Sequence, residues 1–150
     1  CGVSRQTFFR NFLDKYDLIN WYFDKLLLES FEHMGSGKTV TEGLTRKFKF
    51  IQKERVFFAG AFRSDDHNSL KEHDFAHICQ FYTNLIVQKT GKPVDEDISF
   101  LLEMYCYASV YMTVKWVLTG MKESPETMAD RLTQAMPAKL EKLFSRLGLL

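Results

Sequence analysis

The sequence predicts an all-helical protein, and two observations lead to this class. Breaks typical of turns and helix caps fall near residues 13–14, 33–38, 64–69, 90–94 and 120–124 and at Pro137, and they divide the chain into segments of helical length. No segment alternates strictly between apolar and polar residues, as a half-buried β-strand does. The 45% hydrophobic content of the 150 residues is enough for one sizeable core.

The composition excludes several functional classes. The formal net charge is +1, so the chain lacks the overall basic field of chromatin or ribosomal proteins, and any DNA contact must be local. The cysteines Cys1, Cys79 and Cys106 are odd in number and form no C-x-x-C pair, which favours a reducing cytoplasm. Because no 18-residue apolar run lacks charge and no signal-peptide core is present, we expect a cytoplasmic protein with no membrane partner.

The first predicted helix, residues 4–13, carries side chains typical of a DNA-reading helix. Gly2 supplies a tight turn, and the Ser4 hydroxyl can accept a backbone N–H at the helix start. Phe8 and Phe12, one helical turn apart, would hold this helix to the rest of the protein. The polar residues able to reach phosphates and base edges are Ser4, Arg5, Gln6, Thr7, Arg10, Asn11 and Lys15.

The order of these residues, Val-Ser-x-x-Thr-Phe-Phe-x-Asn-Phe-x-Asp-Lys before a long amphipathic helix, resembles the TetR family of bacterial transcriptional regulators. The resemblance covers residues 2–19, and Trp116-Val-Leu-Thr-Gly120 followed by Ser124-Pro125-Glu126 is also common in such proteins. Two positions depart from the family's motif. Phe9 stands where a tyrosine commonly contacts a phosphate, and Asn11, where histidine is frequent, can still pair with adenine.

The resemblance implies a helix-turn-helix regulator that binds a palindromic DNA operator as a homodimer, is controlled by an effector and is not an enzyme. Residues 1–32 would be the recognition and connector helices of an incomplete DNA-binding domain, and residues 33–150 the effector-binding and dimerisation domain. The helices that precede a recognition helix, about 40 residues, are expected to be missing from this chain.

The second and third predicted helices connect this head to the body. Residues 15–31 place Ile19, Phe23, Leu26 and Ser30 on one stripe. Residues 40–62 form a longer helix with an apolar stripe that only Arg55 interrupts, while Arg46, Lys47, Lys49 and Lys53 read as a solvated face. The third helix carries on its stripe Leu44, Phe48, Ile51, Arg55, Phe58 and Phe62.

A fourth helix, residues 70–89, should bury Phe75, Ile78, Cys79, Tyr82 and Ile86. The fifth, residues 98–119, is apolar almost all round, because only Glu103 and Lys115 are charged. One of its stripes should enter the core: Ile98, Leu102, Tyr105, Ser109, Met112 and Trp116. The other has coiled-coil spacing and should meet a second copy of the chain: Phe100, Met104, Tyr107, Tyr111, Val114 and Leu118.

The last region should contribute a second helix to a four-helix dimer interface. Ser124 is the expected N-cap and Pro125 the first helical residue, and Pro137 should kink or split the helix. The residues expected at the interface from this region are Leu132, Met136, Leu140, Leu143 and Leu147.

Two motifs resemble a phosphate-binding loop and a metal site, but each lacks part of the residue set that such a site needs. Gly35-Ser36-Gly37-Lys38-Thr39 lacks the first glycine of a phosphate-binding loop, because position 32 is Glu32, so Thr39 or Thr41 more simply caps the next helix. His73 and His77 share one helical face, and a third metal ligand would have to come from Asp66, His67 or Glu103. We expect no metal and no cofactor, with a metal-binding domain or enzyme as an alternative.

Polar side chains within apolar stripes, together with 15% aromatic residues, suggest a small-molecule pocket. The candidate effector-binding residues are Arg55, Phe58, Phe62, His77, Phe81, Glu103 and Tyr105. The charged members could instead pair with one another to offset their desolvation. A co-regulator protein could also replace the small molecule, as in the TetR-like activators of dihydroxyacetone-kinase operons.

Overall fold

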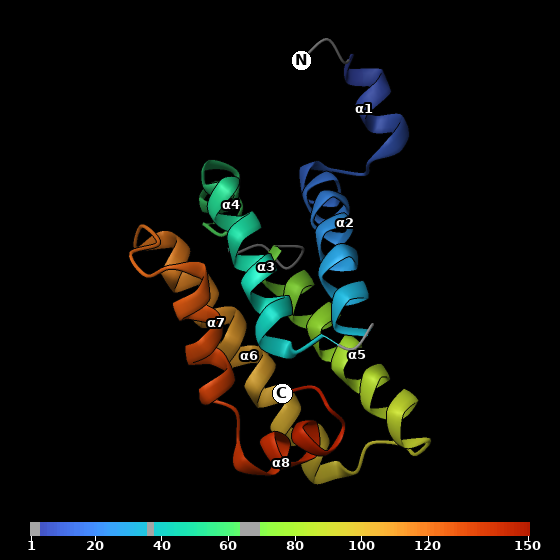
Figure 1. The fold of residues 1–150 in the computed structure, drawn as a ribbon. Helices are drawn as coiled ribbons and strands as arrows, with labels where there is room; N and C mark the ends of the chain where they lie inside the picture. Colours follow the sequence, from blue (N-terminus) through green and yellow to red (C-terminus); the bar gives the residue numbers. More distant parts are fainter. Residues whose placement is uncertain (1–3, 36–37, 64–69) are drawn as a thin grey trace.

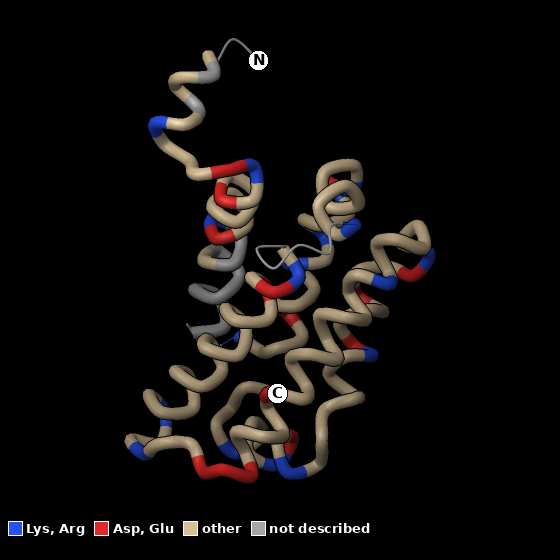
Figure 2. The backbone as a smooth tube through the Cα atoms, turned by 180° about the vertical axis from the view of Figure 1, so that it is seen from behind, with Lys and Arg blue, Asp and Glu red and all other residues tan. Residues whose placement is uncertain are grey.

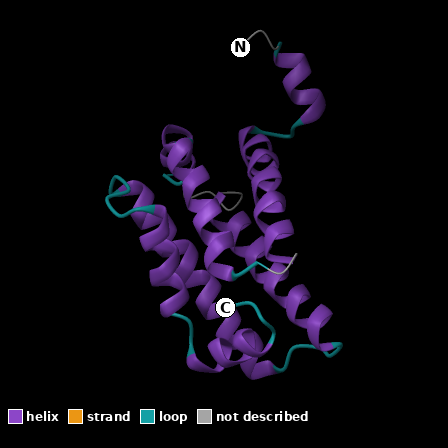
Figure 3. Ribbon diagram, in the orientation of Figure 1, coloured by secondary structure: helices purple, strands orange, loops and turns teal. Residues whose placement is uncertain are grey.

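The computed structural model describes residues 4–35, 38–63 and 70–150, and within these ranges it consists of eight helices joined by loops (Figures 1 and 3). The all-helical prediction is therefore confirmed. The helices are α1 (Arg5–Asn11), α2 (Lys15–Gly35), α3 (Val40–Lys53), α4 (Arg55–Ala61), α5 (Leu70–Thr90), α6 (Glu96–Leu118), α7 (Pro125–Gln134) and α8 (Ala138–Arg146).

The body is a bundle of long helices, and α1 lies beyond one end of it (Figure 1). Helix α3 packs mainly against α7 and α2, α5 packs against α6 and α2, and α8 contacts α6 at the end of the bundle opposite α1. The end of the chain returns to this bundle, because the backbone N–H of Val40 donates to the carbonyl of Leu149 at 2.8 Å. The start of α3 is thus joined to the C-terminal tail.

Side-chain caps fix the helix starts, as the sequence predicts at Thr39 and Ser124. The Thr39 hydroxyl accepts the N–H of Glu42, and the Asp95 carboxylate accepts the N–H of Ile98. Asp14 does the same for α2, where its Oδ1 accepts from the backbone of Tyr16 at 2.7 Å. These caps satisfy N–H groups that the helices cannot satisfy themselves.

Residues 40–62 form two helices where the sequence predicts one. Glu54 separates α3 from α4 with φ −99° and ψ 32°. Arg55, the predicted polar member of the apolar stripe, is exposed, whereas Phe58 and Phe62 are buried. The break at Glu54 thereby keeps both phenylalanines in the core and leaves the guanidinium hydrated. The break that the sequence does predict within a helix, at Pro137, is confirmed between α7 and α8.

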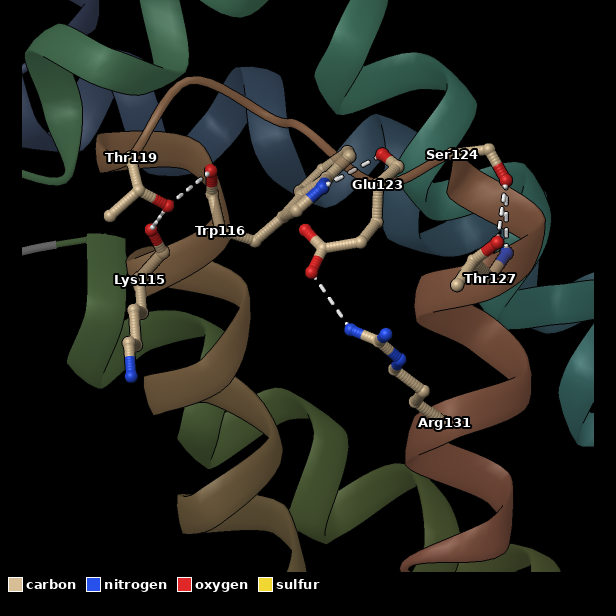
Figure 4. Close-up of polar contacts among 7 residues, drawn as sticks. All are labelled: Lys115, Trp116, Thr119, Glu123, Ser124, Thr127 and Arg131. Carbon is tan, nitrogen blue, oxygen red and sulfur yellow. Dashed lines mark hydrogen bonds and ion pairs between the residues drawn. The ribbon is translucent and has the colours of Figure 1, made fainter.

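The turn from α6 to α7 is held by side-chain contacts (Figure 4). The indole Nε1 of Trp116 donates to the carbonyl of Glu123 at 3.0 Å, and the Glu123 carboxylate accepts from Arg131 at 2.8 Å. Ser124 then caps α7, its Oγ accepting the N–H of Thr127 at 3.1 Å. The indole bond thus joins the turn to α6, and the other two contacts join the turn to α7.

Aromatic rings fill the centre of the bundle. Phe58 of α4 is fully buried, and its ring lies 5.9 Å from Phe23 of α2, 5.9 Å from Phe50 of α3 and 5.2 Å from Phe57. All three contacts are edge-on, the geometry that the ring quadrupoles favour. These rings join three helices through a single side chain.

A buried ion pair crosses the same core. Lys47 Nζ lies 2.7 and 2.8 Å from the two carboxylate oxygens of Asp74, and the two side chains are 8% and 0% exposed. The interpretation of Lys47 as part of a solvated face is therefore wrong. Lys47 lies one turn from Gly43 and one turn from Ile51, both buried, so it sits on the inner side of α3.

The surface charges are mixed. Lys and Arg are interspersed with Asp and Glu along the described part of the chain (Figure 2), which agrees with the net charge of +1. Among the described helices, none combines the length and apolar character needed to span a lipid bilayer.

Candidate functional site

Helix α1 presents most of the predicted DNA-contacting residues to solvent. The Ser4 hydroxyl accepts the N–H of Thr7 at 3.1 Å and so caps the helix, as predicted. The Asn11 amide donates to the Thr7 carbonyl at 2.8 Å, one turn earlier. The exposed members of the set are Ser4, Gln6, Thr7, Phe9, Arg10, Asn11 and Lys15, whereas the side chain of Arg5 lies outside the described part of the chain.

The connection between α1 and α2 is short and locally ordered. The Phe12 ring lies 5.6 Å from that of Trp21 in α2, with the two planes at 67°. The Leu13 N–H donates to the Asp17 carboxylate at 3.0 Å. Phe12 thus fixes α1 to the next helix as expected, and the side chain of Phe8, the other expected anchor, is outside the described residues.

Helix α6 carries a row of exposed apolar side chains, which we call the α6 stripe. The exposed fractions reach 67% for Phe100, 60% for Tyr107 and 63% for Tyr111. The opposite side of α6 is buried as predicted, apart from Met112, which is exposed. The α6 stripe consists of Phe100, Met104, Tyr107, Tyr111 and Leu118, all exposed, and the half-buried Val114.

The surface along the α6 stripe is hollowed. A groove of about 620 Å³ lies over the middle of α6 and has almost wholly apolar walls. Beside it, the Phe75 ring of α5 lies 5.5 Å from that of Tyr107, so α5 extends the apolar surface. Contiguous exposed aromatic surface of this kind is typical of a protein interface. The groove is lined by Phe100, Glu103, Met104, Tyr107, Ala108, Tyr111 and Met112.

The last region does not offer the interface residues that the sequence predicts. Leu132, Met136 and Leu140 are buried within the single chain. Leu143 and Leu147 are half-buried and pack against the same core. The reason is the split at Pro137, because α7 then packs on α3 while α8 turns across the end of the bundle. Of the two regions expected to form the interface, α6 is the one that leaves its predicted apolar residues exposed.

The seven predicted effector-binding residues are spread over several parts of the described structure, although the rings of Phe58 and Phe62 lie 5.8 Å apart. Phe58, Phe62 and Tyr105 are buried, and Phe81 is half-buried with its ring 5.4 Å from that of Tyr82. The charged members lie on different surfaces of the protein. Arg55 lines a hollow of about 370 Å³ together with Arg63, Val117 and Met121, Glu103 lines the α6 groove, and His77 faces α2.

The buried polar groups near these residues are already satisfied. The Tyr105 hydroxyl donates to the carbonyl of Leu132 at 2.9 Å, which ties α6 to α7. Burial raises the pKa of this hydroxyl and, likewise, the pKa of the Cys106 thiol beside Cys79. Both groups are therefore protonated at neutral pH, and a buried thiol of this kind is a poor nucleophile.

The two histidines of α5 lie against Asp24 of α2, a residue to which no sequence motif points. His73 Nε2 lies 2.6 Å and His77 Nε2 lies 3.6 Å from the same oxygen, Oδ1 of Asp24 in α2. The expected sources of a third ligand differ: Glu103 lies on another surface, and Asp66 and His67 are outside the described residues. Asp24 is 49 residues from His73, so only the packing of α2 on α5 reveals it.

Comparison with known proteins adds one finding. Residues 38–138 match a family model described as a transcriptional regulator C-terminal region. The match covers α3 to α7 and the first residue of α8, and thus includes the α6 stripe. No curated protein matches the sequence.

Proposed function

The chain belongs to the TetR family of transcriptional regulators, and we propose that it acts as a homodimer that binds DNA through α1 and pairs through the α6 stripe. The observation that carries this proposal is the α6 stripe, an exposed apolar row that lines a large groove on a helix whose opposite side is mostly buried. A second copy would cover the row and place two α1 helices on one assembly. Two heads spaced by one DNA turn, about 34 Å, would read a palindrome.

The α6 stripe supports this pairing because it is nearly symmetric in sequence. A twofold axis that crosses α6 near position 109 would set two α6 helices antiparallel and bring equidistant positions together. Apolar residues then meet apolar residues, aromatic rings meet aromatic rings, and a carboxylate meets an ammonium group. The equidistant pairs are Phe100 with Leu118, Met104 with Val114, Tyr107 with Tyr111, and Glu103 with Lys115.

A charge exchange tests this register. In the antiparallel arrangement, Glu103→Lys or Lys115→Glu alone puts like charges opposite each other twice, and either should weaken association about tenfold. The double substitution restores opposite charges and should recover most of the loss. Sedimentation equilibrium on the three variants measures the dissociation constants. Recovery of association in the double variant cannot arise from unrelated damage to the fold. A double variant that associates more weakly than both single variants would rule out the register.

The proposed DNA contact is tested on the full-length protein. Gln6→Ala removes a side chain able to pair with a base edge and should lose about 1–3 kcal/mol at one operator position. Arg10→Ala removes a phosphate contact and should lower the salt dependence of binding by about one unit of slope. Gln88→Ala, an exposed glutamine on α5, is the matched control and should bind normally. Failure of the full-length protein to prefer any sequence among random duplexes would contradict the proposal.

We also propose that an effector controls this regulator. The hollow beside Arg55 and Arg63 has apolar walls from Val117 and Met121, a combination suited to a small amphipathic anion. A co-regulator protein is the alternative, and it would occupy the α6 groove in place of a second copy. The charge-exchange experiment distinguishes a second copy of the chain from a co-regulator protein at this groove. A chain that stays monomeric in every variant favours the co-regulator protein.

A further inference from the structure

We propose that Asp24, His73 and His77 form a binding site for a divalent transition-metal ion of the zinc type. Two imidazole nitrogens and one carboxylate oxygen, contributed by two different helices, lie within 4.8 Å of one another. Both imidazoles turn Nε2 toward the same oxygen, Asp24 Oδ1. The site is separate from α1 and from the α6 stripe, so it goes beyond the proposed function.

The donor set determines which ion fits. Imidazole nitrogen combined with one carboxylate is typical of zinc and its transition-metal neighbours, whereas Mg²⁺ and Ca²⁺ take oxygen ligands. Residues four apart on a helix lie on one face, which lets His73 and His77 reach a common ion. Their ring centroids are 4.3 Å apart, so the two rings already lie side by side.

The two distances to Asp24 require only small adjustments. Zinc bonds of about 2.0–2.1 Å in a tetrahedron separate neighbouring ligand atoms by about 3.3 Å. The His77 to Asp24 distance of 3.6 Å is close to this value. The His73 to Asp24 distance of 2.6 Å is a hydrogen bond that must open by less than about 1 Å when the ion replaces the shared proton.

The three side chains are also accessible. They are 37% exposed for Asp24, 23% for His73 and 46% for His77, so an ion can enter from solvent and keep water at its remaining coordination position. Because Asp24 belongs to α2 and both histidines to α5, a bound ion would fasten the two helices together. An ion that binds only this folded arrangement must stabilise it.

Titration of the chain with ZnCl₂, followed by calorimetry and by melting temperature, tests the proposal. We expect one equivalent to bind per chain and the melting temperature to rise. Asp24→Asn and His77→Ala should each weaken binding by at least about tenfold and abolish the rise, since loss of even an outer partner of a metal ligand has that effect. His77 is half-exposed, so its substitution leaves the fold intact for comparison.

The control removes the other two of the chain's four histidines. The double variant His33→Ala and His67→Ala should bind zinc as the unmodified chain does. CoCl₂ should give visible absorption of a tetrahedral site without a thiolate charge-transfer band, because no cysteine is a ligand. The proposal is overturned by stoichiometric binding that survives both Asp24→Asn and His77→Ala, by loss of binding in the control, or by absence of binding.

Discussion

At the scale of single residues, Lys47 of α3 and Arg55 of α4 exchange the roles that the sequence suggests. Helical periodicity continued through residues 40–62 puts Arg55 on the apolar stripe and Lys47 on the charged face. In the structure Arg55 is exposed and Lys47 is buried against Asp74. The first difference follows from the break at Glu54, which helical periodicity alone does not predict. The second depends on Asp74, which lies 27 residues away and comes near only through packing.

The Lys47 and Asp74 pair leads to a stability prediction. Lys47→Met leaves the fully buried Asp74 carboxylate without its cation and should lower the free energy of unfolding by about 3–5 kcal/mol. Replacing both partners, as Lys47→Met with Asp74→Leu, removes the unpaired charge and should recover much of this loss. Urea unfolding of the three proteins measures the effect. If the double variant is no more stable than Lys47→Met alone, the loss does not come from an unpaired charge.

At the scale of helices, the sequence predicts where helices occur and how they are capped better than it predicts whether a helix is continuous. Ser4, Thr39 and Ser124 act as caps in the structure because capping depends on local residue types. The split at Pro137 is also local, since proline lacks the N–H that the helix interior needs. The packing of α7 on α3 is not local, so the sequence predicts a partner contact for leucines that one chain buries or half-buries.

Ser124 provides a prediction at this scale. Ser124→Ala removes the hydroxyl that accepts the Thr127 N–H and should cost about 1 kcal/mol of folding free energy. The α6 to α7 turn should loosen with it, because Glu123 beside it accepts the Trp116 indole. Urea unfolding followed by tryptophan fluorescence checks both effects. Ser99→Ala, at an exposed position in the first turn of α6, is the matched control, and an equal loss there would show that the cap is not the cause.

At the scale of the whole molecule, the sequence predicts two apolar sides on α6, and the structure shows which of them is buried within one chain. A helix that is apolar all round must be covered all round, and the bundle of one chain covers only the side of Leu102, Tyr105 and Trp116. The α6 stripe remains exposed beside a groove of about 620 Å³. The effector-binding set could not be predicted in the same way, because its members belong to different surfaces that only the tertiary packing defines.

Sedimentation of the chain at micromolar concentration shows whether two chains pair through the α6 stripe. We expect a dimer of the 17.6 kDa chain. Tyr111→Asp should convert it to a monomer, because pairing would bury an uncompensated carboxylate at the middle of the α6 stripe. Leu28→Asp, which places the same charge on an exposed apolar position of α2, should leave the dimer intact. A monomer of the unmodified chain, or a Tyr111→Asp variant that dimerises as well as Leu28→Asp, would contradict pairing through α6.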